Sequence, residues 1–177
     1  MTDDRRPTKD DARLKRLDVS AAKAFAEQKY GKAANLFRSV LRLKRQLLSA
    51  DHPDLGIVHM DLARTLLWQG EPDCAYRHAA EALEIFQGHY GTGHISLVDP
   101  LSALAEASCE TGANKDAVAS MRRAIGILEK DFGPDHMVLA SSLLQYAKFL
   151  HQAGDGAASI EVEKRGHRIY AANKNHR

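Results

Sequence analysis

A spacing of 42 residues recurs along this 177-residue chain and constrains its fold more than any other feature of the sequence. Two sets of residues keep this spacing, namely His52, His94 and His136, and Gly70, Gly112 and Gly154. A fixed period of this length is typical of arrays in which one structural unit is repeated and stacked. The same offset, applied towards the N-terminus, places Gln28 at the glycine position. The sequence therefore predicts four copies of one unit, of which the first is divergent.

The second copy indicates that this unit is a helical hairpin. Its first helix is predicted to begin at Pro53 and to end at Gly70, because proline fits the first turn of a helix and glycine can adopt the left-handed conformation that ends one. Apolar residues recur on one face of this helix, at Leu55, Val58, Leu62 and Leu66. A second helix follows, with small or apolar residues at Cys74, Ala75, Ala79, Ala82, Leu83 and Phe86. One hairpin cannot bury its own apolar faces, so successive hairpins must stack.

The composition supports an all-α protein. Apolar residues make up 44% of the chain and charged residues 27%, whereas aromatic residues, on which β proteins depend, make up 6%. No apolar run is long enough to span a membrane, and no apolar segment follows the charged N-terminus. Cys74 and Cys109 show neither metal-ligand nor redox spacing, as expected of free thiols. We therefore expect a cytoplasmic protein with no membrane association.

The predicted fold is a right-handed α-solenoid of about four antiparallel hairpins, or eight helices. The repeats are expected at about 10–49, 53–88, 95–131 and 137–172. The helices are expected at about 10–27, 32–49, 53–69, 73–88, 96–111, 115–131, 137–152 and 156–172. The array would thus cover 10–172, with a disordered N-terminus at 1–9 and a disordered tail at 173–177. Pro100 disfavours a helical Asp99, so the fifth helix should start late or bend in its first turn.

These residues resemble the tetratricopeptide repeat. Its pattern of spaced leucine, small residues and glycine is met in the second copy by Leu62, Ala63, Gly70, Ala75, Ala79 and Ala82, and in the third by Leu104, Ala105, Gly112, Ala117, Met121 and Ala124. The first copy carries the related set Tyr30, Ala33 and Phe37. The 42-residue period and the connector from Gly133 to His136 are similar to the kinesin light chain type. The fourth copy departs from the pattern at Ser159, Glu163 and Gly166, so we expect its last helix to be looser or to cover something different.

The resemblance implies that the first helices of the hairpins line a concave groove that binds a protein or peptide. The first copy offers Lys15, Asp18, Val19, Ala22, Phe25 and Ala26 on that face. The candidate partner-binding residues in the later copies are Asp61, Arg64, Trp68, Asp99, Glu106, Glu110, Gln145, Lys148 and His151. Four carboxylates against one arginine give the groove an acidic centre, which favours a segment carrying Lys or Arg beside an apolar residue. Trp68 is either a binding anchor or a residue packed between hairpins two and three.

Catalysis, metal binding and cofactor binding find little support in the sequence. The recurrent histidines lie on successive hairpins, about 10 Å apart, which is too far for one metal ion, so we expect them to cap the connectors or to wedge into them. No phosphate-binding loop, nucleophile elbow or metalloprotease motif occurs. Cys109 and His151 occupy equivalent positions on neighbouring copies and could form a nucleophile and base. We favour packing or groove-lining roles for both and expect no catalytic residue, no metal and no cofactor.

The charge distribution leaves a second hypothesis open. Residues 1–50 hold 13 Lys and Arg against 6 Asp and Glu, whereas residues 51–116 hold 3 against 11. Arg38, Arg42 and Arg45 form a stripe on one helical face that could meet phosphates, but without interleaved aromatic residues we expect no nucleic acid and favour a solvated convex face. The alternative function is a regulatory or enzyme-associated subunit that binds through this basic face. The fourth hairpin, without a capping helix, could also form a homodimer.

Overall fold

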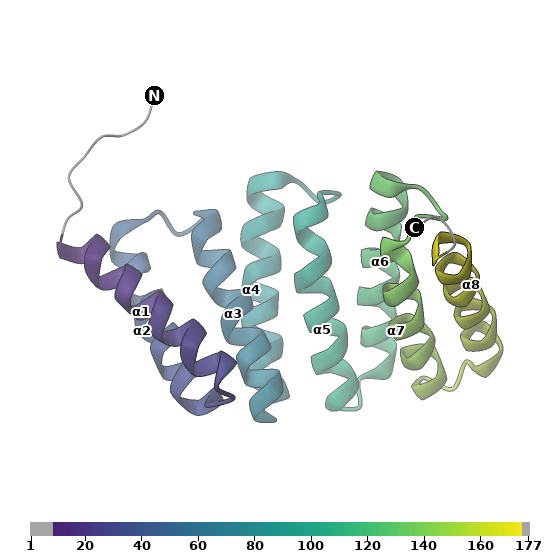
Figure 1. Cartoon of the computed structure of the whole chain (residues 1–177), viewed down its shortest axis with the longest axis horizontal. Helices are drawn as coiled ribbons and strands as arrows, with labels where there is room; N and C mark the ends of the chain where they lie inside the picture. Colours follow the sequence, from purple (N-terminus) through teal and green to yellow (C-terminus); the bar gives the residue numbers. More distant parts are fainter. Residues whose placement is uncertain (1–8, 175–177) are drawn as a thin grey trace.

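The computed structural model describes residues 9–174 and shows an all-α array (Figure 1). Within this range there are eight α-helices and one short 3₁₀ turn. They are α1 (Lys9–Ala26), α2 (Tyr30–Leu47), α3 (Pro53–Gln69), α4 (Pro72–Tyr90), η1 (Ile95–Leu97), α5 (Val98–Glu110), α6 (Asn114–Phe132), α7 (Val138–Gln152) and α8 (Gly156–Lys174). The predicted all-α solenoid of four hairpins is confirmed.

Consecutive helices pack as pairs, and the pairs follow one another along the long axis of the molecule, from α1 and α2 at one end to α7 and α8 at the other (Figure 1). Contacts also join α3 to α5 and α5 to α7, so the first helices of the second, third and fourth hairpins lie side by side. Fully buried alanines, including Ala75, Ala79 and Ala82, occupy the helix-crossing positions. Small side chains there let the two helices of a hairpin approach closely.

The recurrent histidines cap the connectors, as predicted. His52 Nδ1 accepts a hydrogen bond from the backbone N–H of Asp54 at 3.1 Å. His94 and His136 accept equivalent bonds from residues two positions further on, at 3.2 and 3.3 Å. Each ring thus satisfies one backbone donor that has no carbonyl partner at the start of a helix.

The glycine positions between paired helices are also confirmed. Gly70, Gly112 and Gly154 have φ angles of 79°, 82° and 88°, in the left-handed region that glycine adopts without steric cost. Gln28 occupies the equivalent place in the first hairpin with a φ of 58°. The backbone geometry of the repeat is therefore kept even where the glycine is lost.

The fifth helix starts late, as predicted, but the stated reason is wrong because Asp99 is helical despite the following Pro100. The helix begins at Val98, two residues after its predicted start, and the 3₁₀ turn η1 precedes it. In this arrangement Pro100 stands in the first turn, where its missing N–H leaves no intrahelical hydrogen bond unmade.

The last hairpin is closely packed, in contrast to the looser helix that the sequence suggested. The Ser159 hydroxyl is buried and donates a hydrogen bond to the Ala147 carbonyl at 2.8 Å. At Gly166, an added Cβ would lie 3.2 Å from the Ala140 carbonyl oxygen. The two departures from the repeat pattern are therefore adaptations to a close approach between α7 and α8.

An arginine bridge recurs between the later hairpins. Arg165 of α8 donates to Glu129 Oε1 of α6 and to the Pro134 carbonyl, both at 2.6 Å. One period earlier, Arg123 of α6 donates to Gln87 Oε1 of α4 and, at 3.1 Å, to the Thr92 carbonyl. Each arginine ties its helix to the preceding hairpin and to the connector that leaves that hairpin.

The predicted disordered ends need one correction. Lys9 belongs to α1, and α8 continues through Asn173 and Lys174, so these three residues are helical. Residues 1–8 and 175–177 lie outside the described part of the chain, as does the prediction made for them. Among residues 9–174, no helix is both long and apolar enough to cross a lipid bilayer.

Candidate functional site

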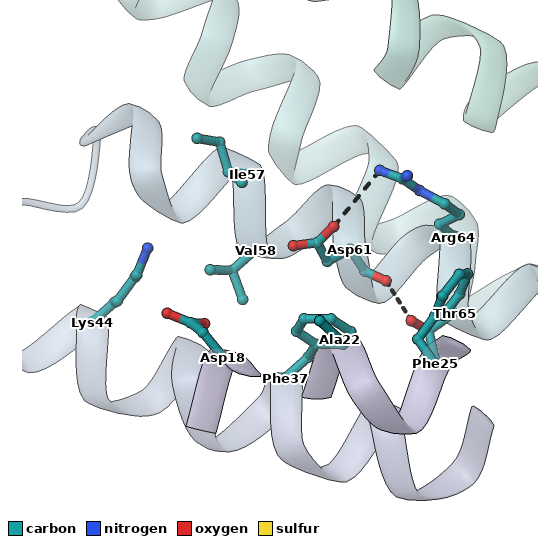
Figure 2. Close-up of a pocket in the computed structure, with 10 residues that line it drawn as sticks. All are labelled: Asp18, Ala22, Phe25, Phe37, Lys44, Ile57, Val58, Asp61, Arg64 and Thr65. Atoms are coloured by element: carbon teal, nitrogen blue, oxygen red, sulfur yellow. Dashed lines mark hydrogen bonds and ion pairs between the residues drawn. The ribbon is translucent and has the colours of Figure 1, made fainter. Parts of the chain in front are cut away.

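A hollow of about 330 Å³ lies where the first hairpin meets α3 (Figure 2). Its lining comes from three helices: Asp18, Ala22 and Phe25 of α1, Phe37 and Lys44 of α2, and Ile57, Val58, Asp61, Arg64 and Thr65 of α3. This volume falls within the usual range for ligand pockets. The hollow therefore combines a well-formed concavity with both apolar and charged side chains.

The local sequence explains how the hollow forms. Phe37 and Val58 are buried and make an apolar floor, while the small side chain of Ala22 leaves space above them. Thr65 is fully buried, and its hydroxyl donates to the Asp61 carbonyl at 2.6 Å within the same helix. The four-residue spacing lets the buried Thr65 hydroxyl find a hydrogen-bond acceptor within its own helix. It also places Asp61 on the same face of α3 as Thr65, where its side chain lines the hollow.

The charged side chains of the hollow are only partly matched. Arg64 pairs with Asp61 at 3.6 Å, and Lys44 pairs with Asp54 at 3.5 Å. Asp18 has no hydrogen bond or ion pair with any residue in the described range 9–174. In Figure 2 its carboxylate lies between Lys44 and Val58. One carboxylate of the hollow is therefore left without a direct partner.

Burial changes the acidity of both carboxyl groups that line the hollow. Desolvation raises the pKa of Asp18, a shift that the nearby Lys44 opposes and Asp54 reinforces. Desolvation likewise raises the pKa of Asp61, against the opposing effect of Arg64. Each carboxylate is thus less stable in its charged form than a carboxylate in water, and a cation placed between them would relieve that cost.

A short row of aromatic rings extends from the hollow. The Phe25 and Tyr30 rings meet edge to face with centroids 5.6 Å apart, and Tyr30 stacks on Trp68 at 6.1 Å and 17°. Trp68 is 65% exposed. Its prediction as a residue packed between hairpins two and three is therefore wrong, because its stacking partner belongs to the first hairpin and most of the indole faces solvent.

The other predicted partner-binding residues lie further along the array. Asp99, Glu106 and Glu110 are exposed on α5, and the Gln145 amide of α7 donates to Glu106 Oε1. Lys148 and His151 of α7 line a separate hollow together with residues of α8. The structure thus brings Asp61 and Arg64 together, with Trp68 on the same helix, and joins Glu106 to Gln145, but it distributes the nine residues over three places.

Lys44 is the charged lining residue that the sequence gave no reason to choose. It belongs to α2, a second helix of a hairpin, whereas the candidates all came from first helices. Its place in the hollow depends on the angle at which the first hairpin meets α3, which is set by tertiary packing. Asp18 and Phe25 were on the predicted groove face, and helical periodicity was sufficient to find them.

The proposed cysteine nucleophile is not supported by its surroundings. The Cys109 thiol donates to Gln152 Oε1 at 2.7 Å rather than to His151. Burial raises the pKa of this thiol, a shift that Glu110 reinforces and Lys148 opposes. A catalytic cysteine requires the opposite, a pKa lowered towards neutrality. Among residues 9–174, no group of three His, Cys, Asp or Glu side chains is placed to hold a metal ion.

The basic stripe on α2 is partly engaged within the chain. Arg38 donates to Asn35 Oδ1 at 3.1 Å, and Arg45 lies 3.3 Å from His59 Nε2. Arg42 remains exposed. Two of the three arginines that could meet an anionic partner therefore already have partners in their own chain.

Comparison with known proteins identifies sequence relatives of this repeat array. A family model for the tetratricopeptide repeat matches residues 25–54. Protein KINESIN LIGHT CHAIN-RELATED 1 of Arabidopsis thaliana is 31% identical over 135 residues, which are 68% of this chain and 22% of that protein. This chain therefore spans about a fifth of the length of that relative.

Two crystal structures resemble the fold. BtubC (BKLC) from P. vanneervenii superposes with a TM-score of 0.85 at 18% identity, over 97% of this chain and 68% of that chain. A Podosopora anserina protein of kinesin light chain type, built from nearly identical TPR-like repeats, has a TM-score of 0.80 at 20% identity, over 90% of this chain and 76% of that one. At these identities the likeness concerns the fold.

The stacked helix pairs and their recurring caps define the class of the molecule, an α-solenoid of helical hairpins. Within this class, residues 25–54 match the tetratricopeptide repeat, and the chain is similar to a kinesin light chain-related protein in sequence and to a protein of kinesin light chain type in fold.

Proposed function

We propose that this array is a non-catalytic protein-interaction scaffold that binds a polypeptide segment along the exposed faces of its first helices. The observation that carries this proposal is the row of exposed side chains on α3 and α5, which lie side by side. Trp68 supplies an exposed aromatic surface, and Asp99, Glu106 and Glu110 supply negative charge. An aromatic anchor beside a field of one sign is suited to holding and steering an oppositely charged segment.

The relatives support the same class of function. Tetratricopeptide arrays vary their surface residues over a constant scaffold, and the fold by itself therefore names no partner. The acidic row favours a partner with lysine or arginine next to an apolar residue. It disfavours a polyanion such as nucleic acid, which the carboxylates of α5 would repel.

A charge-reversal experiment tests the proposal. Glu106→Lys and Glu110→Lys, combined with Trp68→Ala, should remove the capture of specific partners from a cell lysate, as identified by mass spectrometry. The melting temperature should fall by only a few degrees, because all three side chains are on the surface. Glu84→Lys, an exposed charge reversal on α4, is the matched control and should leave capture unchanged. If the triple variant still captures the same partners, the proposed binding surface is refuted.

The last helix, α8, favours a second candidate, self-association. Its side chains Ile160 and Tyr170 are 53% and 49% exposed, and a second copy of the chain would remove this apolar surface from water. Light scattering at high micromolar concentration tests this candidate directly. A dimer that Ile160→Glu converts to a monomer would support it, and a monomeric wild-type protein would rule it out.

A further inference from the structure

The charged side chains in and beside the hollow carry one more negative than positive charge. Asp18, Asp61, Lys44 and Arg64 line the hollow. Asp54 lies beside it and pairs with Lys44, while Arg64 pairs with Asp61. Asp18 is the carboxylate that remains without a direct partner within residues 9–174. The site is therefore complementary to one additional positive charge.

The walls of the hollow suit a long side chain that ends in a charge. Phe25, Phe37 and Val58 provide apolar surface, and the carboxylates of Asp18 and Asp61 project from α1 and α3 towards the opening (Figure 2). Lysine and arginine have an apolar methylene stem that packs against such surface while the cationic head reaches polar groups. A small metal cation would gain nothing from these walls.

Two exposed apolar residues flank the hollow on α3. Ile57 is 52% exposed and Trp68 is 65% exposed. Together with Asp61 and Arg64 they lie at helical spacings that place all four on one face. At a rise of about 1.5 Å per residue, Asp61 is roughly 6 Å along the helix from Ile57 and roughly 10 Å from Trp68.

These distances define a spacing in a bound segment. An extended chain advances about 3.3 Å per residue and its successive side chains point to opposite faces, so the side chains that face α3 lie roughly 7 Å (two positions) or roughly 13 Å (four positions) from the one that enters the hollow. A side chain resting on Ile57 would thus be two positions away. Because two positions fall short of Trp68, a side chain resting on the indole would be four positions away on the other side.

We infer that the hollow is a binding subsite for one lysine or arginine of an extended partner segment, with apolar residues of that segment two positions before and four positions after it, or in the reverse order. This inference rests on the proposed function and locates its anchoring point at the junction of the first two hairpins. The cationic head lies between Asp18 and Asp61, and the flanking apolar side chains cover Ile57 and the exposed face of Trp68.

Synthetic peptides test the subsite. The probe is the capped heptapeptide Leu-Ser-Arg-Ser-Ser-Ser-Phe, together with its reversed sequence, because the segment direction is not fixed by the spacing. The matched controls replace arginine by citrulline, which keeps the shape without the charge, and by glutamate. Calorimetry measures affinity, and the emission of Trp68, the one tryptophan of the chain, reports contact at that end of α3.

The expected result is that one orientation of the arginine peptide binds and shifts the Trp68 emission, whereas the citrulline peptide binds at least about tenfold more weakly. Asp18→Asn and Asp61→Asn should each weaken the arginine peptide by about fivefold or more without changing the circular dichroism spectrum. Glu84→Gln, a neutralised exposed carboxylate on α4, should have no effect.

Several results would overturn the subsite. Among the peptides, equal affinity for the arginine and citrulline forms would contradict it, as would tighter binding of the glutamate peptide through Lys44 and Arg64. Affinity for the arginine peptide that is unchanged by both aspartate substitutions, or binding that leaves the Trp68 emission unchanged, would also contradict it. So would the absence of saturable binding up to about 1 mM. If partner capture still depends on Glu106 and Glu110 in any of these cases, the proposed function stands and the subsite alone fails. If capture is independent of those residues, the proposed function itself fails.

Discussion

The first and last junctions between hairpins are built on the same 42-residue template but are held together differently. At the last junction, Arg165 bridges to Glu129 and to the connector. At the corresponding positions of the first junction the charges are exchanged, with Glu81 in place of the arginine and Arg45 in place of the glutamate. Arg45 contacts His59 instead. The capping residues are therefore constant along the array, whereas the residues that join hairpins vary from one junction to the next.

This difference has a functional side. The first junction contains the hollow with Asp18, which has no direct partner within residues 9–174, and the buried His59, which lies 3.2 Å from the partly buried His78. The last junction is closed by a paired arginine. Partly buried polar side chains that lack an ion-pair or hydrogen-bond partner lower the stability of the fold, and they are retained most readily where they serve binding. The first junction is accordingly the better place to look for function, and the last for stability.

The largest expected effect is a dependence of stability on pH that comes from the first junction. His59 is 1% exposed, and its burial, reinforced by the neighbouring His78 and Arg45, lowers its pKa from 6.5 to about 4. Between these values the unfolded chain binds more protons than the folded one, so the free energy of unfolding falls as the pH falls. The full shift corresponds to about 3 kcal/mol, and burial lowers the pKa of His78 in the same direction.

Urea unfolding of the wild type and of His59→Gln, followed by circular dichroism at about pH 7.5 and about pH 4.5, measures this effect. The wild type should lose roughly 2–3 kcal/mol more than the variant over this range. His151→Gln, at an exposed position on α7, is the control and should behave as the wild type does. Parallel pH dependences for the wild type and His59→Gln would show that the first junction is not the acid-sensitive one.

The second prediction concerns the arginines at the two junctions. Arg165→Ala removes two charge-assisted hydrogen bonds and leaves a half-buried Glu129, at a cost of about 1–2 kcal/mol after allowing for solvent screening. Arg45→Ala should cost less than about 0.5 kcal/mol, because this side chain is exposed. Chemical denaturation of the two variants distinguishes the junctions. Equal losses would mean that both arginines hold hairpins together to the same degree.

A third, smaller difference is expected at the turn within each hairpin. Gly154→Ala should destabilise the protein by about 1 kcal/mol, because a Cβ is strained at a φ of 88°. Gln28 already carries a Cβ at positive φ, so Gln28→Gly should relieve strain and stabilise by a few tenths of a kcal/mol. Thermal melts of both variants measure this difference in sign. Destabilisation by Gln28→Gly would show that its side chain makes a compensating contribution.

The features that could be predicted from sequence are those that depend on local chemistry. Histidine caps and left-handed turns each follow from a few neighbouring residues, and they recur with the 42-residue period. The face of α3 that holds Asp61 and Arg64 also follows from helical periodicity alone.

The remaining features depend on how hairpins meet. Lys44 enters the hollow because of the angle between α2 and α3. Trp68 finds its partner in Tyr30, on the preceding hairpin. The Arg165 bridge keeps the 42-residue period with Arg123, but a recurring arginine is as common on a solvated face as in a bridge. These contacts join residues far apart in the sequence, and periodicity carries no information about their geometry.

The smallest expected effect compares one carboxylate from each junction. Asp18→Asn should stabilise the protein slightly, by less than about 0.5 kcal/mol at neutral pH, because it removes a desolvated and unpartnered charge. The gain should disappear in acid, since the raised pKa of Asp18 means that protonation already favours the fold there. Glu129→Gln should act in the opposite direction by a similar amount, because its carboxylate is paired with Arg165 at 2.6 Å. Denaturant midpoints of the two variants and of the wild type, each measured at neutral and acidic pH, test the pair. A loss of stability in Asp18→Asn would mean that this carboxylate stabilises the fold. The first junction would then no longer differ from the last by holding a charge that lowers stability.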